Sequence, residues 1–171
     1  TADILDKLVQ SVGALWPRIE LLQARFWQQQ KMHDKARELL RKTVEKHPDA
    51  IQPRLALAGA YKKERWHTER CQLLEPLAVK WTDWPNLQYR YGDCLEDQRF
   101  YSRAEAIYLR LLRQLPNSRT ILHRLYWHAV GNERHAAAER YATRFTQALP
   151  HKRLGWMNLA EVSRRMGAFD E

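Results

Sequence analysis

Apolar residues recur every three to four positions along most of the chain, which is the spacing of an amphipathic α-helix. The segment AEAIYLRLLRQLPN, residues 104–117, shows this pattern and then reaches Pro116. Similar segments reach Pro48 and Pro150, and the intervals between these three prolines are 68 and 34 residues. Because proline lacks an amide donor and restricts the residue before it, each proline marks the end of a helix. The helical pattern therefore recurs with a period of 34 residues.

The pattern predicts helices and no strand, because no segment alternates apolar and polar residues over the length of a strand. The predicted helices span residues 3–15, 18–30, 34–47, 51–63, 67–80, 86–98, 101–115, 118–131, 134–148 and 153–166. The first helix carries apolar residues at helical spacing: Ile4, Leu5, Leu8, Val9, Val12 and Leu15. It lacks the small residues of the later segments, so we interpret residues 1–16 as a capping helix or as the second helix of an upstream repeat.

Small and large residues also recur with this period. The predicted repeats are residues 17–50, 51–84, 85–118 and 119–152, with a partial repeat at 153–171. In the third repeat, Gly92 and Ala104 are the small residues and Tyr108 is the large one. The first and fourth repeats follow the same order, with Ala24, Trp27, Ala36, Leu40 and Pro48, and with Leu125, Ala138, Ala142 and Pro150. The second repeat is degenerate, because Arg70 stands in place of a small residue.

These positions resemble the tetratricopeptide repeat family over roughly residues 17–171. The resemblance implies an all-α fold, a right-handed superhelix of stacked antiparallel helix pairs. Paired helices approach closely at Ala or Gly, and larger side chains fill the layer between successive pairs. A single pair cannot bury its apolar face alone, so the pairs must stack. Because the chain has only 6 glycines, we expect irregular turns between the paired helices.

The resemblance also implies that the first helix of each repeat lines a concave face that holds a ligand. The predicted partner-binding residues on that face are Arg18, Arg25, Lys62, Lys63, Tyr89, Asp93, Glu96, Asp97, His123, Trp127 and Arg164. They form a basic first part, an acidic middle and an aromatic patch, and aromatic side chains are frequent anchors for a bound peptide. A solvated basic surface and packed aromatic rings are the alternative interpretations. Leu21 and Arg25 stand where the family's chaperone-binding clamp needs Lys and Asn, which disfavours a cochaperone.

Composition adds one permissive feature, a net charge of +9 from 29 basic and 20 acidic residues. This charge allows an anionic partner such as nucleic acid but does not require one. The sequence has neither an apolar run long enough for a membrane span nor a visible signal peptide. It begins at Thr1 and stops partway through the repeat pattern, so we interpret it as part of a longer protein. Both the cytoplasm and the periplasm are compatible with it.

Catalytic and cofactor motifs are missing from the sequence. None of the 7 histidines has a metal-ligand spacing on one helical face, and the glycines form no phosphate-binding loop. We therefore predict that the chain is not an enzyme and holds no cofactor or metal. Cys71 and Cys94 lie on predicted helices that stack on each other in this family, so both a disulfide and two separate buried thiols remain open.

The leading functional hypothesis is a non-catalytic scaffold that binds a protein or peptide in its concave groove as part of a larger protein or complex. One alternative is an RNA-associated module, because residues 102–108 look like the half-a-tetratricopeptide repeats of RNA-processing factors. Another alternative is the repeat region of a bacterial envelope protein that exports or modifies polysaccharide. An apolar face at the end of an incomplete repeat array further predicts a homodimer through residues 153–171.

Overall fold

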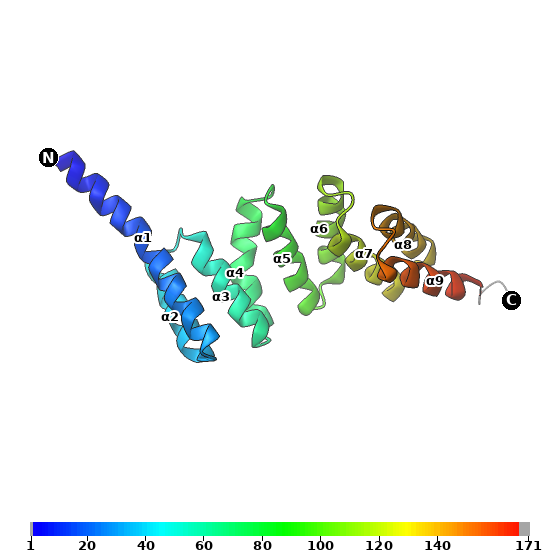
Figure 1. Ribbon diagram of the computed structural model, residues 1–171, viewed down its shortest axis with the longest axis horizontal. Helices are drawn as coiled ribbons and strands as arrows, with labels where there is room; N and C mark the ends of the chain where they lie inside the picture. Colours follow the sequence, from blue (N-terminus) through cyan, green and yellow to red (C-terminus); the bar gives the residue numbers. More distant parts are fainter. Residues whose placement is uncertain (1, 168–171) are drawn as a thin grey trace. The chain divides into compact units, whose positions relative to one another are not determined.

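The computed structural model describes the backbone of residues 2–167 and the side chains of residues 15–167. Within this range the protein is all-helical and has no strand, which confirms the predicted fold class. The chain consists of two compact units, Thr1–Trp81 (unit 1) and Thr82–Glu171 (unit 2). Unit 1 contains α1 (Ala2–Gln29), α2 (His33–Lys46), α3 (Ile51–Lys63) and α4 (His67–Lys80) (Figure 1). Unit 2 contains α5 (Pro85–Asp97), α6 (Tyr101–Gln114), α7 (Arg119–Gly131), α8 (His135–Ala148) and α9 (Arg153–Gly167).

The first helix differs from the prediction. Separate helices at 3–15 and 18–30 were expected, but α1 runs without interruption from Ala2 to Gln29 with Pro17 inside it. An internal proline removes one hydrogen bond and disturbs the preceding turn, yet the bonds on either side remain. Because apolar residues keep a helical spacing on both sides of Pro17, the helix continues through it.

The turns between paired helices are regular, which corrects the expectation drawn from the scarcity of glycine. Backbone φ is positive at Lys31, Arg65, Arg99 and Glu133, and these residues recur at intervals of 34. After each of them, the next amide donates across the turn to a carbonyl five residues earlier, as Phe100 does to Leu95 at 2.8 Å. This is the hydrogen bond that closes a helix in a Schellman motif. Lys, Arg, Arg and Glu therefore adopt the left-handed conformation that usually belongs to glycine.

We expect Arg99→Gly to raise the stability of unit 2 by roughly 0.5–1 kcal/mol. A left-handed backbone costs a non-glycine residue about 1–2 kcal/mol, and the extra freedom of glycine in the unfolded chain offsets part of the gain. Arg99 has a φ of 65° and an exposed side chain. Urea denaturation can measure the change, with Arg113→Gly inside α6 as the control that should lose about 1 kcal/mol. A loss of stability in both variants would contradict the proposed relief of strain.

Unit 1 consists of two helix pairs, in which α1 packs on α2 and α3 packs on α4. Its core also contains contacts of α3 with both α1 and α2. The buried residues of this core are Leu21, Ala24, Ala36, Leu40, Leu57 and Tyr61. Ala24 and Ala36 are small residues on facing helices, which allows α1 and α2 to approach closely. These contacts hold the first turns of α3 next to the middle of α1.

Unit 2 packs α5 on α6, α7 on α8 and α8 on α9, with α6 also against α7. The predicted small and large positions lie in its interior, where Ala104, Tyr108, Ala138 and Ala142 are fully buried. Gly92 lies directly against the ring of Tyr108, and Gly155 lies against Phe145. Side chains of α7, α8 and α9 meet around Tyr126, Ala138 and Val162. Among the described helices of the chain, none is long and apolar enough to cross a bilayer.

Candidate functional site

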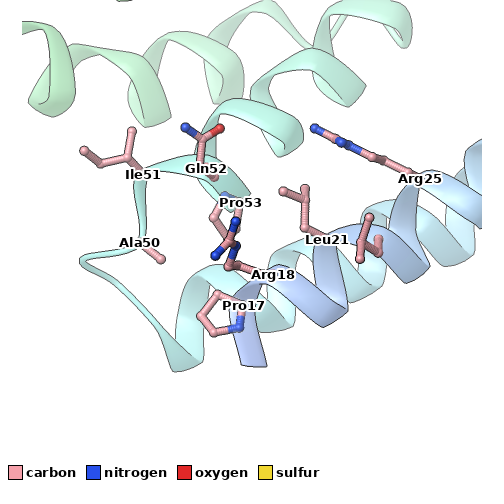
Figure 2. Close-up of a pocket in the computed structure, with 9 residues that line it drawn as sticks. Pro17, Arg18, Leu21, Arg25, Ala50, Ile51, Gln52 and Pro53 are labelled. Atoms are coloured by element: carbon pink, nitrogen blue, oxygen red, sulfur yellow. The ribbon is translucent and has the colours of Figure 1, made fainter. Parts of the chain in front are cut away.

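A pocket of about 640 Å³ lies between α1 and the start of α3 in unit 1. Its lining residues are Pro17, Arg18, Leu21, Leu22, Arg25, Ala50, Ile51, Gln52 and Pro53. Figure 2 shows Arg18, Leu21 and Arg25 on the side of α1 that faces the first turn of α3. These three residues are separated by one and two helical turns, so they share a face of α1. The pocket thus has an apolar floor between two arginines.

Both arginines of this pocket are exposed, and neither Arg18 nor Arg25 has an ion pair or hydrogen bond among the described side chains. Glu20, the acidic residue nearest to them in the sequence, lies instead toward α2, with Oε1 3.6 Å from Lys46 Nζ. The guanidinium groups are therefore available to an incoming anion. Arginine is well suited to this task because its planar fork can hold a carboxylate or a phosphate through two hydrogen bonds.

Lys62 and Lys63, the other predicted basic residues, lie in the last turn of α3 and have exposed side chains. They do not line the pocket, which lies at the opposite end of α3. The structure thus places the four predicted cations of unit 1 at two locations. Gln52, by contrast, joins Arg18 and Arg25 in the pocket wall through the packing of α3 on α1.

The predicted acidic residues of unit 2 form an internal ionic cluster. Asp93 is only 3% exposed, and its Oδ1 accepts a hydrogen bond of 2.6 Å from Arg124 Nη2. The other nitrogen of the guanidinium, Nη1, donates to Glu96 Oε2 at 2.6 Å. Glu96 Oε1 lies 2.5 Å from His128 Nε2. Two carboxylates on α5 are therefore bound by Arg124 and His128 on α7, while Asp97 is exposed at the end of α5.

Arg124 is the central residue of this cluster, although it is not among the residues predicted from the sequence. Burial alone would lower the pKa of Arg124, but its hydrogen bond with Tyr89 and the charge of Glu96 raise that pKa above the usual value. The guanidinium therefore stays charged at every pH at which the protein is folded. One feature of the sequence could have indicated this contact. Arg124 and His128 lie four residues apart on one face of α7, and Asp93 and Glu96 lie three residues apart on α5.

The predicted aromatic residues have different environments. Tyr89 is half-buried, its ring centroid 5.9 Å from that of Tyr108, and its hydroxyl group lies 3.5 Å from Arg124 Nη2. Trp127 is 50% exposed, and its Nε1 donates to Nε2 of His123 at 3.0 Å. The ring centroids of Trp127 and Tyr126 lie 5.2 Å apart, with the two ring planes at 77°. Trp127 is thus held in place on α7 while half of it faces solvent.

His123 accepts that hydrogen bond through an unprotonated nitrogen. Burial lowers the pKa of His123 below its usual value of 6.5, and the positive charges of Arg124 and Arg119 lower it further. The neutral imidazole is therefore the form that holds the Trp127 indole. Protonation of His123 removes the acceptor and places a third positive charge beside two arginines.

We expect the imidazole of His123 to titrate below pH 6.5 in the folded protein. Because the unfolded chain then binds the proton more readily, the stability of unit 2 decreases as the pH falls below about 6.5. Heteronuclear NMR of the imidazole nitrogens can measure the pKa directly. The variant Arg119→Gln should shift this pKa upward, since it removes one of the nearby charges. A midpoint at or above 6.5 in the unsubstituted protein would contradict the structural assignment.

Arg164, the last predicted residue, is exposed on α9 and forms an ion pair with Glu161 at 3.1 Å. Arg165 donates to the same carboxylate at 2.7 Å, and these two arginines lower the pKa of Glu161. Arg164 therefore lies in a local pair on its own helix. Among the described residues, no group of three or more His, Cys, Asp or Glu side chains is placed to hold a metal ion.

Residues 20–50 match the family model described as Tetratricopeptide repeat. Residues 20–50 therefore match one tetratricopeptide repeat. Solved structures share the helical fold along most of the chain. "MamA 41-end from Desulfovibrio magneticus RS-1" is similar with a TM-score of 0.78 and 11% identity, over 88% of this chain and 85% of that one. "Crystal structure of MamA protein" has a TM-score of 0.80 and 13% identity, over 92% and 86%.

A third structure, "MamA MSR-1 C2", has a TM-score of 0.62 and 18% identity, over 88% of this chain and 78% of that one. No curated protein matches the sequence. At these identities the comparison with solved structures concerns the fold. The tetratricopeptide repeat match and the shared fold confirm the predicted resemblance and support a role as a protein-interaction scaffold. The division of the chain into repeats and the individual partner-binding residues stay predictions.

Proposed function

We propose that the tetratricopeptide repeat of unit 1 binds an extended protein segment that carries an apolar side chain next to an acidic one. The observation that carries this proposal is the α1–α3 pocket, which combines an apolar floor with two arginines that have no anionic partner among the side chains of residues 15–167. Its volume of about 640 Å³ exceeds what one side chain fills. A segment of several residues is therefore the occupant that matches the size of the site.

Each part of the pocket contributes a different kind of binding energy. Burial of one leucine-sized side chain on Leu21, Leu22 and Pro53 contributes about 1.5–3 kcal/mol. A carboxylate held by Arg18 or Arg25 forms charge-assisted hydrogen bonds, which are about twice as strong as neutral ones. Lys62 and Lys63 add positive potential at the other end of α3, which favours the approach of an acidic segment. We propose that Trp127 offers an equivalent anchor in unit 2, where it is half exposed and fixed by His123.

The proposal can be tested by selecting random peptides of twelve residues for binding to the full chain. We expect the selected peptides to combine an acidic residue with an apolar one. Their affinity should fall about tenfold in Arg18→Glu and in Arg25→Glu, since each variant loses one charged contact. Lys35→Glu makes the same change of charge on the exposed surface of α2, outside the pocket, and serves as the matched control. Equal binding by all three variants would exclude the pocket as the binding site.

Two alternative functions make different predictions. Free arginines also suit phosphate groups, so an RNA-associated role predicts binding of single-stranded RNA that weakens steeply as salt rises. If affinity for RNA at physiological salt is no better than millimolar, that alternative fails. A role in envelope polysaccharide export would require a sequence upstream of Thr1 that directs the protein to the envelope. The peptide experiment separates both from the leading proposal, because neither predicts selection of acidic peptides at Arg18 and Arg25.

A further inference from the structure

The α1 helix exposes a stripe of large apolar side chains. Leu15, Ile19, Leu22 and Phe26 are between 44% and 62% exposed, which is unusual for four such residues on one helix. Their spacing of four, three and four residues places them in one row along α1. We call this row the α1 seam. A contiguous apolar row in solvent indicates an interaction surface.

The spacing of the α1 seam is that of a coiled coil. Heptad positions a and d alternate at intervals of three and four, and the seam assigns Ile19 and Phe26 to a and Leu15 and Leu22 to d. The same spacing continues upstream in the sequence through Val12, Leu8 and Leu5, whose side chains lie outside the described residues. The backbone of α1 is helical over this whole region, from Ala2 to Gln29. The pattern therefore extends over three heptads of one continuous helix.

The α1 seam is not used by the fold of unit 1. The residues with which α1 packs on α2 and α3, Leu21 and Ala24, are buried. At 100° per residue, Ala24 lies on the far side of the helix from the seam. Leu21 and Ala24 occupy heptad positions c and f, so the α1 seam at a and d remains available when unit 1 is folded. Packing at c and f also holds α1 in its helical form, which reduces the entropy that association must overcome.

We propose that the α1 seam pairs with the same seam of a second copy of this chain in a parallel, two-stranded coiled coil. The residue types at a and d support this occupant, because β-branched residues at a with leucine at d favour parallel dimers. Val12 and Ile19 are the β-branched a residues, and Leu15 and Leu22 are at d. A closed pair also leaves no unpaired apolar row, as a symmetric dimer requires.

The charges beside the seam select the parallel orientation. Arg18 and Arg25 occupy g positions, and Gln23 occupies an e position. In an antiparallel pair the g positions of the two helices face each other, which would bring four arginines together. In a parallel pair each g position faces an e position, so Arg18 of one copy lies opposite Gln23 of the other. The parallel dimer therefore avoids repulsion and leaves the arginines without an acidic partner.

This dimer differs from the one that the sequence predicts at residues 153–171. At that end, Trp156 and Met157 of α9 are exposed and give an alternative apolar surface. The α1 seam shares Leu22 with the α1–α3 pocket, but Leu15 and Ile19 do not line that pocket. Substitutions at these two residues therefore test self-association without removing a contact from the pocket.

Sedimentation equilibrium of the full chain tests the proposal. We expect twice the chain mass of 20.4 kDa at about 100 μM. The variants Leu15→Glu and Ile19→Glu should sediment as single chains with unchanged circular dichroism, with self-association at least about 100-fold weaker because a charge enters an apolar seam. Val79→Glu makes a similar change at an exposed apolar residue of α4 and should remain dimeric. A single-chain mass for the unsubstituted protein would overturn the proposal, as would a dimer that only Met157→Glu dissociates.

Cross-linking tests the orientation of the helices. In a parallel pair, identical a residues of the two copies lie next to each other, so Ile19→Cys should form a dimer linked by a disulfide under mild oxidation. Lys35→Cys places a thiol on the exposed surface of α2 and is the matched control. A covalent dimer is expected only for Ile19→Cys on a non-reducing gel. Equal cross-linking of the two variants, or none in a protein that sediments as a dimer, would overturn the parallel arrangement.

Discussion

Replacing Arg124 with methionine is expected to destabilise unit 2 by about 3 kcal/mol or more. The substitution removes the guanidinium that binds Asp93 and Glu96, whose side chains are only 4% and 12% exposed. A methionine fills a similar volume, so the loss comes from two carboxylates that are left buried without a positive partner at that position. Urea denaturation monitored by circular dichroism can measure the free energy of unfolding.

The matched control for this variant is Arg119→Met, which removes an exposed arginine from the first turn of the same helix. It should change the free energy of unfolding by no more than about 0.5 kcal/mol. The triple variant Arg124→Met, Asp93→Asn, Glu96→Gln should recover part of the loss, because neutral side chains carry a smaller penalty when buried. If Arg124→Met and Arg119→Met are equally stable, the cluster does not contribute as the structure indicates.

The second large effect is expected from Gly92→Ala, which should destabilise unit 2 by about 2–3 kcal/mol. A Cβ atom at Gly92 would lie 2.8 Å from Cε1 and 3.1 Å from Cζ of Tyr108. The Tyr108 ring is fully buried and cannot rotate away, so the helices α5 and α6 would have to separate. Thermal and urea denaturation both report this change.

Gly131→Ala is the control for Gly92→Ala, since a Cβ atom at Gly131 would have no atom within 4 Å. Alanine there should be neutral or slightly stabilising, because it has the higher helix propensity. The double variant Gly92→Ala, Tyr108→Leu should be less destabilised than the two single effects added together, since the smaller side chain relieves the overlap. Additive effects would indicate that Gly92 does not act through contact with Tyr108.

The sequence predicted the parts of this fold that depend on local periodicity. Helix bounds follow from apolar spacing and from the 34-residue period, so α3 and α4 begin and end where the pattern indicates. The small residues Ala36, Ala104 and Ala138 lie in the core for the same reason, because each occupies the same position in a recurring helix pair. Two local expectations were wrong, the helix break at Pro17 and the irregular turns. At Pro17 and in the turns, the hydrogen bonds of the surrounding backbone outweighed the conformational preference of a single residue.

Only the tertiary structure decided which side chains meet. Arg124 reaches Glu96 and Asp93 across 28 and 31 residues of sequence, and the spacing of these residues along α5 and α7 does not by itself show that packing brings them together. The α1–α3 pocket likewise depends on packing, since Arg18 and Arg25 were expected from the first helix alone while Ile51 and Pro53 come from another. The linear sequence by itself determined the repeating helices, because those arise from bonds between near neighbours. The ionic cluster and the pocket were decided by helix packing, which brings distant residues within reach of one another.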